Sequence, residues 1–196
     1  MRLVSPRRAR RAAVQPLPGR IGVARPGAGT GPETGQSLVE FSLVLMPLFF
    51  VLLGIIQFGF IFNSFVTMTN AAREGARTGT IYICDSSISK DQNDLARNES
   101  IKTALLGSMN LLGKTTPYFA TSGTWTKSVL TFTNGDLVVT YVIPAGVTDT
   151  DCRRGEQVTV RATYHQDLIV PIVSGFLPAD AGGRLRLIGE VTMVLN

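Results

Sequence analysis

The chain is poor in the residues from which most active sites are built. It has one histidine, one tryptophan and two cysteines among 196 residues. The histidine, His165, stands alone near the end of a predicted strand, with no cysteine close in sequence to suggest a metal site. Ser87 and Lys90 have the SxxK spacing of a known catalytic motif, but the sequence lacks the partner motifs that accompany it in enzymes. We therefore expect no catalytic residues, no metal or other cofactor and no small-molecule substrate.

One long stretch of the chain carries no charge: no ionisable residue lies between Glu40 and Arg73. Residues 41–62 are predominantly apolar, and about 20 such residues suffice to cross a bilayer core. The run is too long for the apolar region of a cleaved secretory signal, which has about 7–15 residues. We predict a transmembrane helix; the alternative is a buried core helix. Pro47 either kinks it or has its missing hydrogen bond absorbed by neighbouring helices.

The basic character of the chain belongs to its first 35 residues. They hold seven of the 19 basic and one of the 14 acidic residues, which leaves 12 basic and 13 acidic residues elsewhere. The positive-inside rule places this end in the cytoplasm and the C-terminal part outside. Because few large apolar residues occur in 1–35, we expect a disordered leader. A basic surface that binds nucleic acid should lie on the folded domain. Here the excess of basic residues lies in the leader, so no nucleic-acid partner is expected.

Residues 36–80 are expected to form the membrane helix and its extension, ending near Gly79. Gly75 and Gly79 have GxxxG spacing, which lets another backbone approach closely. The approaching element is either another subunit or the domain's own sheet, and the sequence leaves both open. Glu74 and Arg77, three residues apart, are expected to form a modest surface pair.

Residues 81–196 predict an extracytoplasmic α+β domain, with helices on one face of an antiparallel sheet of about four strands. A helix over 91–112 follows from the helical spacing of Leu95, Ile101, Leu105 and Met109. Alternating residues on either side of Asn134–Gly135 predict a β-hairpin. The four expected strands are 127–133, 136–143, 157–165 and 184–195.

The two cysteines, Cys84 and Cys152, fall on the predicted outer side of the membrane, where disulfides form. A bridge between them would close a 68-residue loop, worth about 4 kcal/mol on the loop-entropy estimate. The alternative is two unpaired thiols. The apolar segment 168–178, broken by prolines and a glycine, is either a sheet-edge loop or a patch that touches membrane or a neighbour.

Two motifs carry a resemblance to a known family. The first is Gly35-Gln-Ser-Leu-Val-Glu-Phe41 before the apolar run, and the second is Thr69-Asn-Ala-Ala-Arg-Glu-Gly-Ala-Arg77. Together they resemble the TadE-like family of tight-adherence (Flp-type) pilus assembly proteins. The family usually has Asp where this chain has Gln57, and often a polar residue where it has Phe60.

The resemblance implies a membrane-anchored minor pilin or pseudopilin with a pilin-like outer domain. It also implies that a prepilin peptidase cleaves after Gly35, so that Gln36 becomes the first residue and Glu40 the fifth. The implied partners are membrane lipid, the prepilin peptidase, the major pilin, other minor pilins and a membrane platform protein. The implied location is the cytoplasmic membrane, with entry into the pilus as a further step.

A second interpretation is an uncleaved single-pass anchor that presents an extracytoplasmic binding or adhesion module. The spacing of Gly35 and Glu40 favours the pilin, whereas the long leader and Gln57 favour the anchor. A third class, a membrane-anchored hydrolase, is not supported, because the sequence contains no catalytic constellation.

Overall fold

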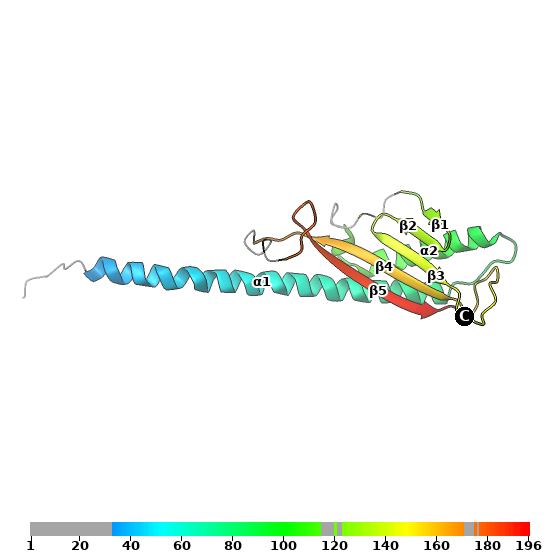
Figure 1. The fold of residues 1–196 in the computed structure, drawn as a ribbon, viewed down its shortest axis with the longest axis horizontal. Coiled ribbons are helices and arrows are strands. Elements are labelled where there is room, and N and C mark those ends of the chain that lie inside the picture. Colours follow the sequence, from blue (N-terminus) through cyan, green and yellow to red (C-terminus); the bar gives the residue numbers. More distant parts are fainter. Residues whose placement is uncertain (1–32, 115–119, 121–122, 171–174, 176) are drawn as a thin grey trace, which may run out of the picture. The chain divides into compact units, whose positions relative to one another are not determined.

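The structure, a computed structural model, describes residues 33–114, 120, 123–170, 175 and 177–196. Residues 1–32, most of the expected leader, lie outside the described residues, as do parts of the segment 168–178. The chain divides into two compact units, Met1–Leu43 and Val44–Asn196. The second unit contains the α+β domain that the sequence predicts (Figure 1).

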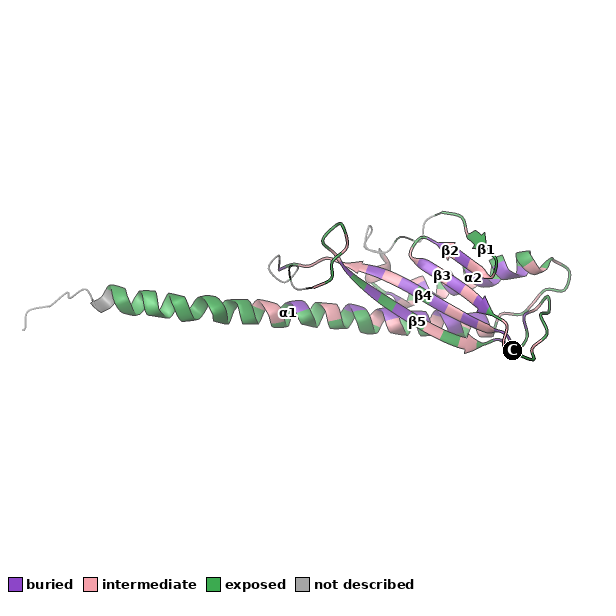
Figure 2. Cartoon of the chain, viewed as in Figure 1, coloured by how far each residue is buried: buried purple, intermediate pink, exposed green. Residues whose placement is uncertain are grey.

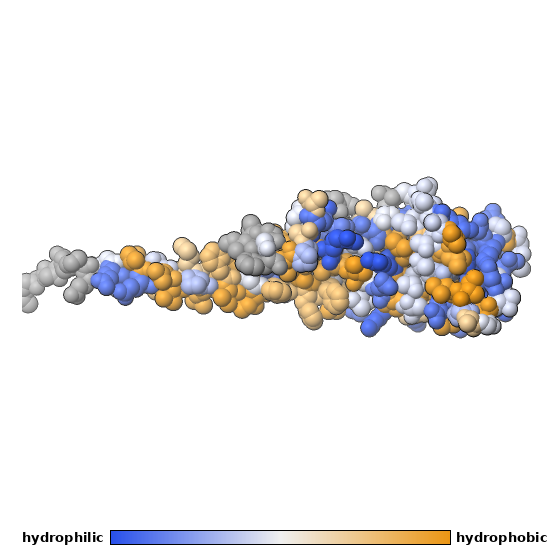
Figure 3. All heavy atoms as spheres, in the orientation of Figure 1, coloured by the Kyte–Doolittle hydropathy of each residue, from blue (hydrophilic) through white to orange (hydrophobic). Residues whose placement is uncertain are grey.

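The first helix, α1, runs from Glu33 to Thr80 and is long and apolar enough to span a membrane. It begins three residues earlier than expected, since it also includes residues 33–35. Residues 35–52 are all exposed, while from Gln57 onward one side of the helix is buried (Figure 2). Hydrophobic side chains dominate its visible surface before the domain (Figure 3). The spacing of the buried residues is helical: 57, 64, 68, 71, 72, 75, 76 and 79.

The second helix, α2, spans Lys90–Ser108. Ser89 caps its N-terminus, and Gln92 bonds back to the Ser89 backbone in a capping box. The helix ends four residues before the expected Leu112, because Asn110 takes a positive φ of 51° and the chain enters a short 3₁₀ turn at Leu112–Lys114. The inclusion of Leu95 in the apolar face was wrong, since Leu95 is 41% exposed.

The sheet is an antiparallel meander in which each strand pairs with the next along the chain. It has five strands rather than about four. The strands are β1 (Thr126–Ser128), β2 (Thr131–Asn134), β3 (Leu137–Val142), β4 (Gln157–Gln166) and β5 (Leu185–Val194).

Both differences from the expected strands lie at turns. The expected strand 127–133 is broken at Val129, which is 84% exposed and has a φ of 55°, a conformation that β-branched residues rarely adopt. Asn134 pairs with Leu137 and so ends β2. The two-residue turn is therefore Gly135–Asp136, one position later than expected, with Gly135 supplying the positive φ.

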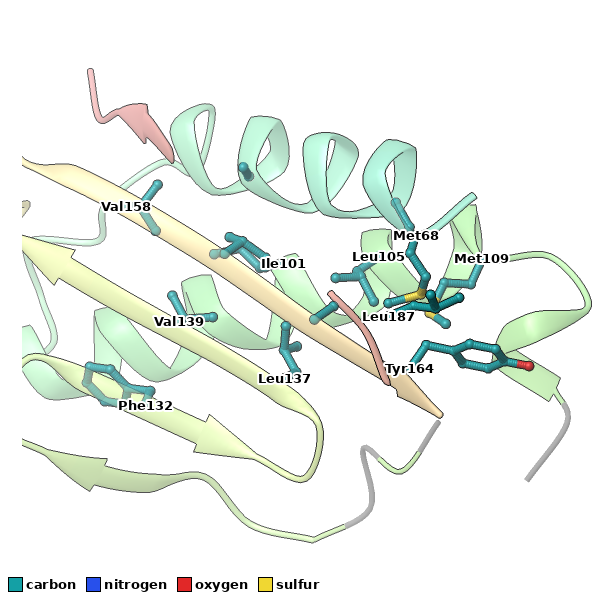
Figure 4. Packing of buried hydrophobic residues seen from close by; sticks show 14 of the residues in the cluster. Met68, Ile101, Leu105, Met109, Phe132, Leu137, Val139, Val158, Tyr164 and Leu187 are labelled. Atoms are coloured by element: carbon teal, nitrogen blue, oxygen red, sulfur yellow. The ribbon is translucent and has the colours of Figure 1, made fainter. Parts of the chain in front are cut away.

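The core lies between the two helices and one face of the sheet. Figure 4 shows Ile101 and Leu105 of α2 and Met68 of α1 beside side chains from the inner face of the strands. Those sheet residues alternate with outward-facing ones along each strand, as a sheet covered on one face requires. They are Phe132, Leu137, Val139, Tyr141, Val158, Val160, Ala162, Tyr164, Leu185 and Leu187.

Gly189 sets how closely β5 approaches α1. A Cβ there would lie 2.7 Å from the Met68 carbonyl oxygen and 3.0 Å from its carbon. We predict that Gly189→Ala lowers the free energy of unfolding by about 1–3 kcal/mol through overpacking against backbone. Thermal unfolding followed by circular dichroism in detergent micelles measures the change.

The matched control is Gly107→Ala in α2, where a Cβ meets nothing within 4 Å. Alanine is favoured over glycine in a helix by up to about 1 kcal/mol, so this variant is expected to be as stable as the wild type or slightly more so. Equal melting temperatures for the two variants would contradict the close approach of β5 to α1.

Candidate functional site

The residues expected at the processing site lie in the first turns of α1. Gly35, Gln36 and Glu40 are exposed, and a Cβ at Gly35 would meet no atom within 4 Å. The Gln36 amide Nε2 donates a hydrogen bond of 3.0 Å to Glu40 Oε1, one helical turn along the chain. The site therefore combines an exposed glycine in the first turn of the helix with a carboxylate one turn beyond Gln36, at the start of an apolar run.

Glu40 stands at the boundary of a surface suited to lipid. Beyond it, the helix exposes apolar side chains on all sides, among them Phe41, Leu43, Phe49 and Ile55. A carboxylate at this boundary is costly if carried into hydrocarbon alone. The free-energy cost of the Glu40 carboxylate at this position therefore depends on which hydrogen-bond donor or cation pairs with it.

Gln57 marks the point where the helix turns from exposed to partly buried. It is 1% exposed, and its Oε1 accepts hydrogen bonds from the backbone N–H groups of Ile169 (2.8 Å) and Val170 (3.4 Å). About two helical turns further on, the Ser64 hydroxyl donates a hydrogen bond of 2.6 Å to Gln166 Oε1. These bonds attach the chain after β4 to the helix. The sequence singled out Gln57 only as a departure from a family pattern, without its partner.

We predict that Gln57→Leu speeds hydrogen exchange at the Ile169 amide, because that N–H loses its buried acceptor. A lost bond to a buried group is worth about 1–3 kcal/mol, so exchange should rise by about one order of magnitude or more. Mass-spectrometric exchange on the detergent-solubilised protein measures it. Phe58→Leu, on the exposed side of the helix, is the control and should leave this amide unchanged. Unchanged exchange in Gln57→Leu would show that the bond does not hold the segment.

Gly75 and Gly79 lie inside the domain and face α2. A Cβ at Gly75 would lie 3.3 Å from the Ile101 carbonyl oxygen, and one at Gly79 would lie 2.8 Å from Ile101 Cδ1. The same Cβ at Gly79 would lie 3.9 Å from Val158 Cγ1 of the sheet. The close approach that the spacing predicts is thus made within this chain, mainly to a helix rather than to the sheet. Glu74 and Arg77 lie 3.6 Å apart on the exposed side.

Cys84 and Cys152 form a disulfide. It joins the segment after α1 to the turn before β4, with Cα atoms 5.6 Å apart. Beside the bridge, Asn93 of α2 accepts from the Asp85 N–H (2.9 Å) and donates to the Asp85 carbonyl (2.8 Å). The same segment is thus held both covalently and by a side chain of α2.

A buried cluster of charges lies next to this bridge, and the sequence analysis missed it. Arg153 Nε and Nη2 donate to both carboxylate oxygens of Asp94 (2.7 and 2.8 Å), and Nη1 donates to Glu156 Oε2 (2.7 Å). Arg97 lies 3.5 Å from Asp94 and donates to the Cys152 carbonyl at 3.1 Å. We call these four residues, two acids and two arginines, the ionic cluster; all are at most 2% exposed.

Aromatic rings and hydrogen bonds complete the surroundings of the ionic cluster. The Tyr141 ring lies 4.3 Å from the Arg153 guanidinium carbon, and the Tyr82 ring lies 5.1 Å from that of Arg97. Burial raises the pKa of Tyr141, whose hydroxyl donates to Asn98. Burial alone would lower the pKa of Arg153, but its hydrogen bonds to the two carboxylates raise it instead. Arg153 therefore keeps its positive charge in this buried position.

We predict that Arg153→Met destabilises the domain by about 3–5 kcal/mol, because buried Glu156 loses its ion-pair partner and buried Asp94 keeps only the longer contact with Arg97. Urea unfolding followed by the fluorescence of the single tryptophan, Trp125, measures it. The control is Arg161→Met, whose exposed pair with Glu190 at 3.8 Å should contribute less than about 1 kcal/mol. Equal small effects would show that the ionic cluster does not hold the domain together.

His165 is partly buried between two carboxylates rather than lying free at a strand end. Its Nδ1 lies 2.7 Å from Asp180 Oδ2, and its Nε2 lies 3.4 Å from Asp136 Oδ1. The hydrogen bond from the Arg184 N–H, together with those from His165 and the Gly182 N–H, lowers the pKa of Asp180 to about 2, although burial acts in the opposite direction. Within the part of the chain that the structure describes, no three His, Cys, Asp or Glu residues are grouped to hold a metal ion.

Comparison with known proteins supports one assignment. The model of the family described as TadE-like protein matches residues 35–77, which cover the exposed first half of α1 and most of its buried second half. The predicted resemblance is thus confirmed over these residues. No curated protein and no solved structure matches the chain.

Proposed function

From the TadE-like match over residues 35–77, we propose that this chain is a non-enzymatic minor pilin or pseudopilin that takes part in assembling a tight-adherence (Flp-type, type IV-like) pilus. It is a single-pass protein of the cytoplasmic membrane. Residues 1–35 lie in the cytoplasm, and the domain lies outside. The exposed apolar surface of α1 and the basic leader before it support this placement.

The observation that carries the proposal is the arrangement of Gly35, Gln36 and Glu40. A prepilin peptidase cleaves after Gly35, which makes Gln36 the first residue, with a free ammonium group, and Glu40 the fifth. Gly35 is exposed, which supports access by a peptidase. Cleavage also removes the arginine-rich leader, whose charges would otherwise hold the chain at the cytoplasmic face.

Glu40 then acts in assembly. When subunits leave the bilayer and their helices come together, the Glu40 carboxylate of one subunit pairs with the Gln36 ammonium of its neighbour. Each charge is costly in apolar surroundings when it is alone. The pairing removes both costs and fixes the axial register between subunits. Its partners are accordingly the major pilin and other minor pilins, with a membrane platform protein acting in assembly.

The domain suits the compartment outside the membrane. It carries the Cys84–Cys152 disulfide, and such bridges persist in oxidising compartments. Since Gly75 and Gly79 are used within the chain, contacts with other subunits fall to the exposed first half of α1 and to the outer surface of the domain.

One observation favours the second candidate function, an uncleaved anchor that presents a binding or adhesion module. The Gln36 side chain already gives Glu40 a hydrogen-bond partner within the chain. In that function the leader stays attached and Glu40 needs no ammonium from a neighbour.

We predict that Glu40→Gln reduces the amount of this protein in sheared pili by about ten-fold or more, because the neighbour's ammonium loses its counter-charge. A single buried ion pair that loses one partner costs several kcal/mol, which justifies that magnitude. Immunoblots of the sheared fibre and membrane fractions give the ratio. Glu74→Gln is the matched control, since Glu74 is an exposed acid of the same helix in the domain. Unchanged incorporation of Glu40→Gln would refute the pairing.

A further inference from the structure

Gln36 has a chemical liability that becomes active only at a chain terminus. In an N-terminal glutamine the free α-amine can attack the side-chain carbon Cδ. A bond forms between the amine nitrogen and Cδ, the bond from Cδ to Nε2 breaks, and ammonia leaves. The product is a neutral five-membered lactam. Such a reaction at Gln36 would abolish the ammonium group on which the proposed subunit pairing depends.

The structure holds the Gln36 side chain in a position opposed to this reaction. Its Nε2 donates to Glu40 Oε1 at 3.0 Å. Residues four apart are neighbours on a helix surface, so this bond directs the amide along the helix toward the following turn. The backbone nitrogen of Gln36, which becomes the amine, lies at the opposite, N-terminal side of the residue. Ring closure requires the amide to leave Glu40 and fold back.

We infer that the Gln36–Glu40 hydrogen bond protects the mature N-terminus from cyclisation. This inference rests on the proposed cleavage after Gly35, and it gives Glu40 a second task. The carboxylate first preserves the ammonium group of its own chain and then accepts the ammonium group of a neighbour. Glu40 is a positioning residue for Gln36, because it touches the amide that would react.

The two tasks of Glu40 need different chemistry. Protection needs a hydrogen-bond acceptor at the end of a side chain of this length, whereas pairing needs negative charge. Glu40→Gln keeps an acceptor oxygen at that length and loses the charge, while Glu40→Ala loses both. The first variant should therefore lose pairing alone, and the second should lose pairing and protection together.

The experiment follows ammonia loss from the processed protein in membranes. Full-length wild type, Glu40→Gln, Glu40→Ala and Gln36→Met are expressed with the peptidase, and purified membranes are incubated for timed intervals. Intact mass gives the fraction of chains that start at residue 36 and the fraction of these that have lost one ammonia. We expect Glu40→Ala to cyclise about two-fold faster than the wild type, the change expected for an exposed hydrogen bond between side chains four residues apart on a helix.

Glu40→Gln should stay closer to the wild type than to Glu40→Ala, and Gln36→Met should lose no ammonia. Equal rates in Glu40→Ala and wild type would overturn the protective role while leaving cleavage intact. A wild-type chain that retains its leader would instead overturn the proposed cleavage, and with it the premise of this inference.

A second measurement covers the case in which Glu40→Ala is not processed. The rate of ammonia loss is compared for the processed wild-type protein in two states. In one it is folded in membranes, and in the other it is in denaturing detergent with urea, where the first turns of α1 are lost. Protection predicts slower ammonia loss in the folded protein by the same factor of about two. Equal rates in the two states would contradict it.

Discussion

One helix presents two different surfaces, an exposed apolar one and a partly buried one, and the rest of the structure follows from that constraint. In hydrocarbon every backbone polar group needs an internal partner, so a spanning segment has to be helical. Here the same helix continues without interruption into the domain, from Glu33 to Thr80. Its first part is exposed all round, and from Gln57 onward one side is covered. The domain is therefore built on the helix, and the strands and α2 are arranged to cover its buried side.

The strands and α2 are held against α1 by close backbone packing at glycines and by buried polar groups. Glycines at 75, 79 and 189 bring α2 and β5 against α1, which leaves little room for repacking. The ionic cluster links α2 to the turn before β4, beside the disulfide. Its two acids and two arginines balance in charge. Such a cluster specifies one arrangement of its elements more than it adds to stability, because desolvation offsets much of the attraction.

The sequence was sufficient for features that depend on local pattern and composition. The apolar run gave α1, alternation gave β3, β4 and β5 within one or two residues, and the outer placement of both cysteines suggested their pairing. The turn at Val129 could not be foreseen, because a β-branched residue disfavours positive φ, and only the pairing of Ser128 with Thr131 places the turn there. Asp94 looked like a helix-start residue, since only the fold brings Arg153 to it from 59 positions away. At the candidate site, Gly35 and Glu40 were visible as a motif, but the bond from Gln36 to Glu40 needed the structure.

The central claim is that the chain is matured after Gly35 and that Glu40 then works with a free N-terminus. Intact mass and N-terminal sequencing of the wild-type protein, extracted from membranes without reductant, test this claim most directly. The proposed function predicts a chain that begins at Gln36 and carries the Cys84–Cys152 bridge. A chain that keeps the arginine-rich leader would contradict it and would identify the protein as a fixed membrane anchor.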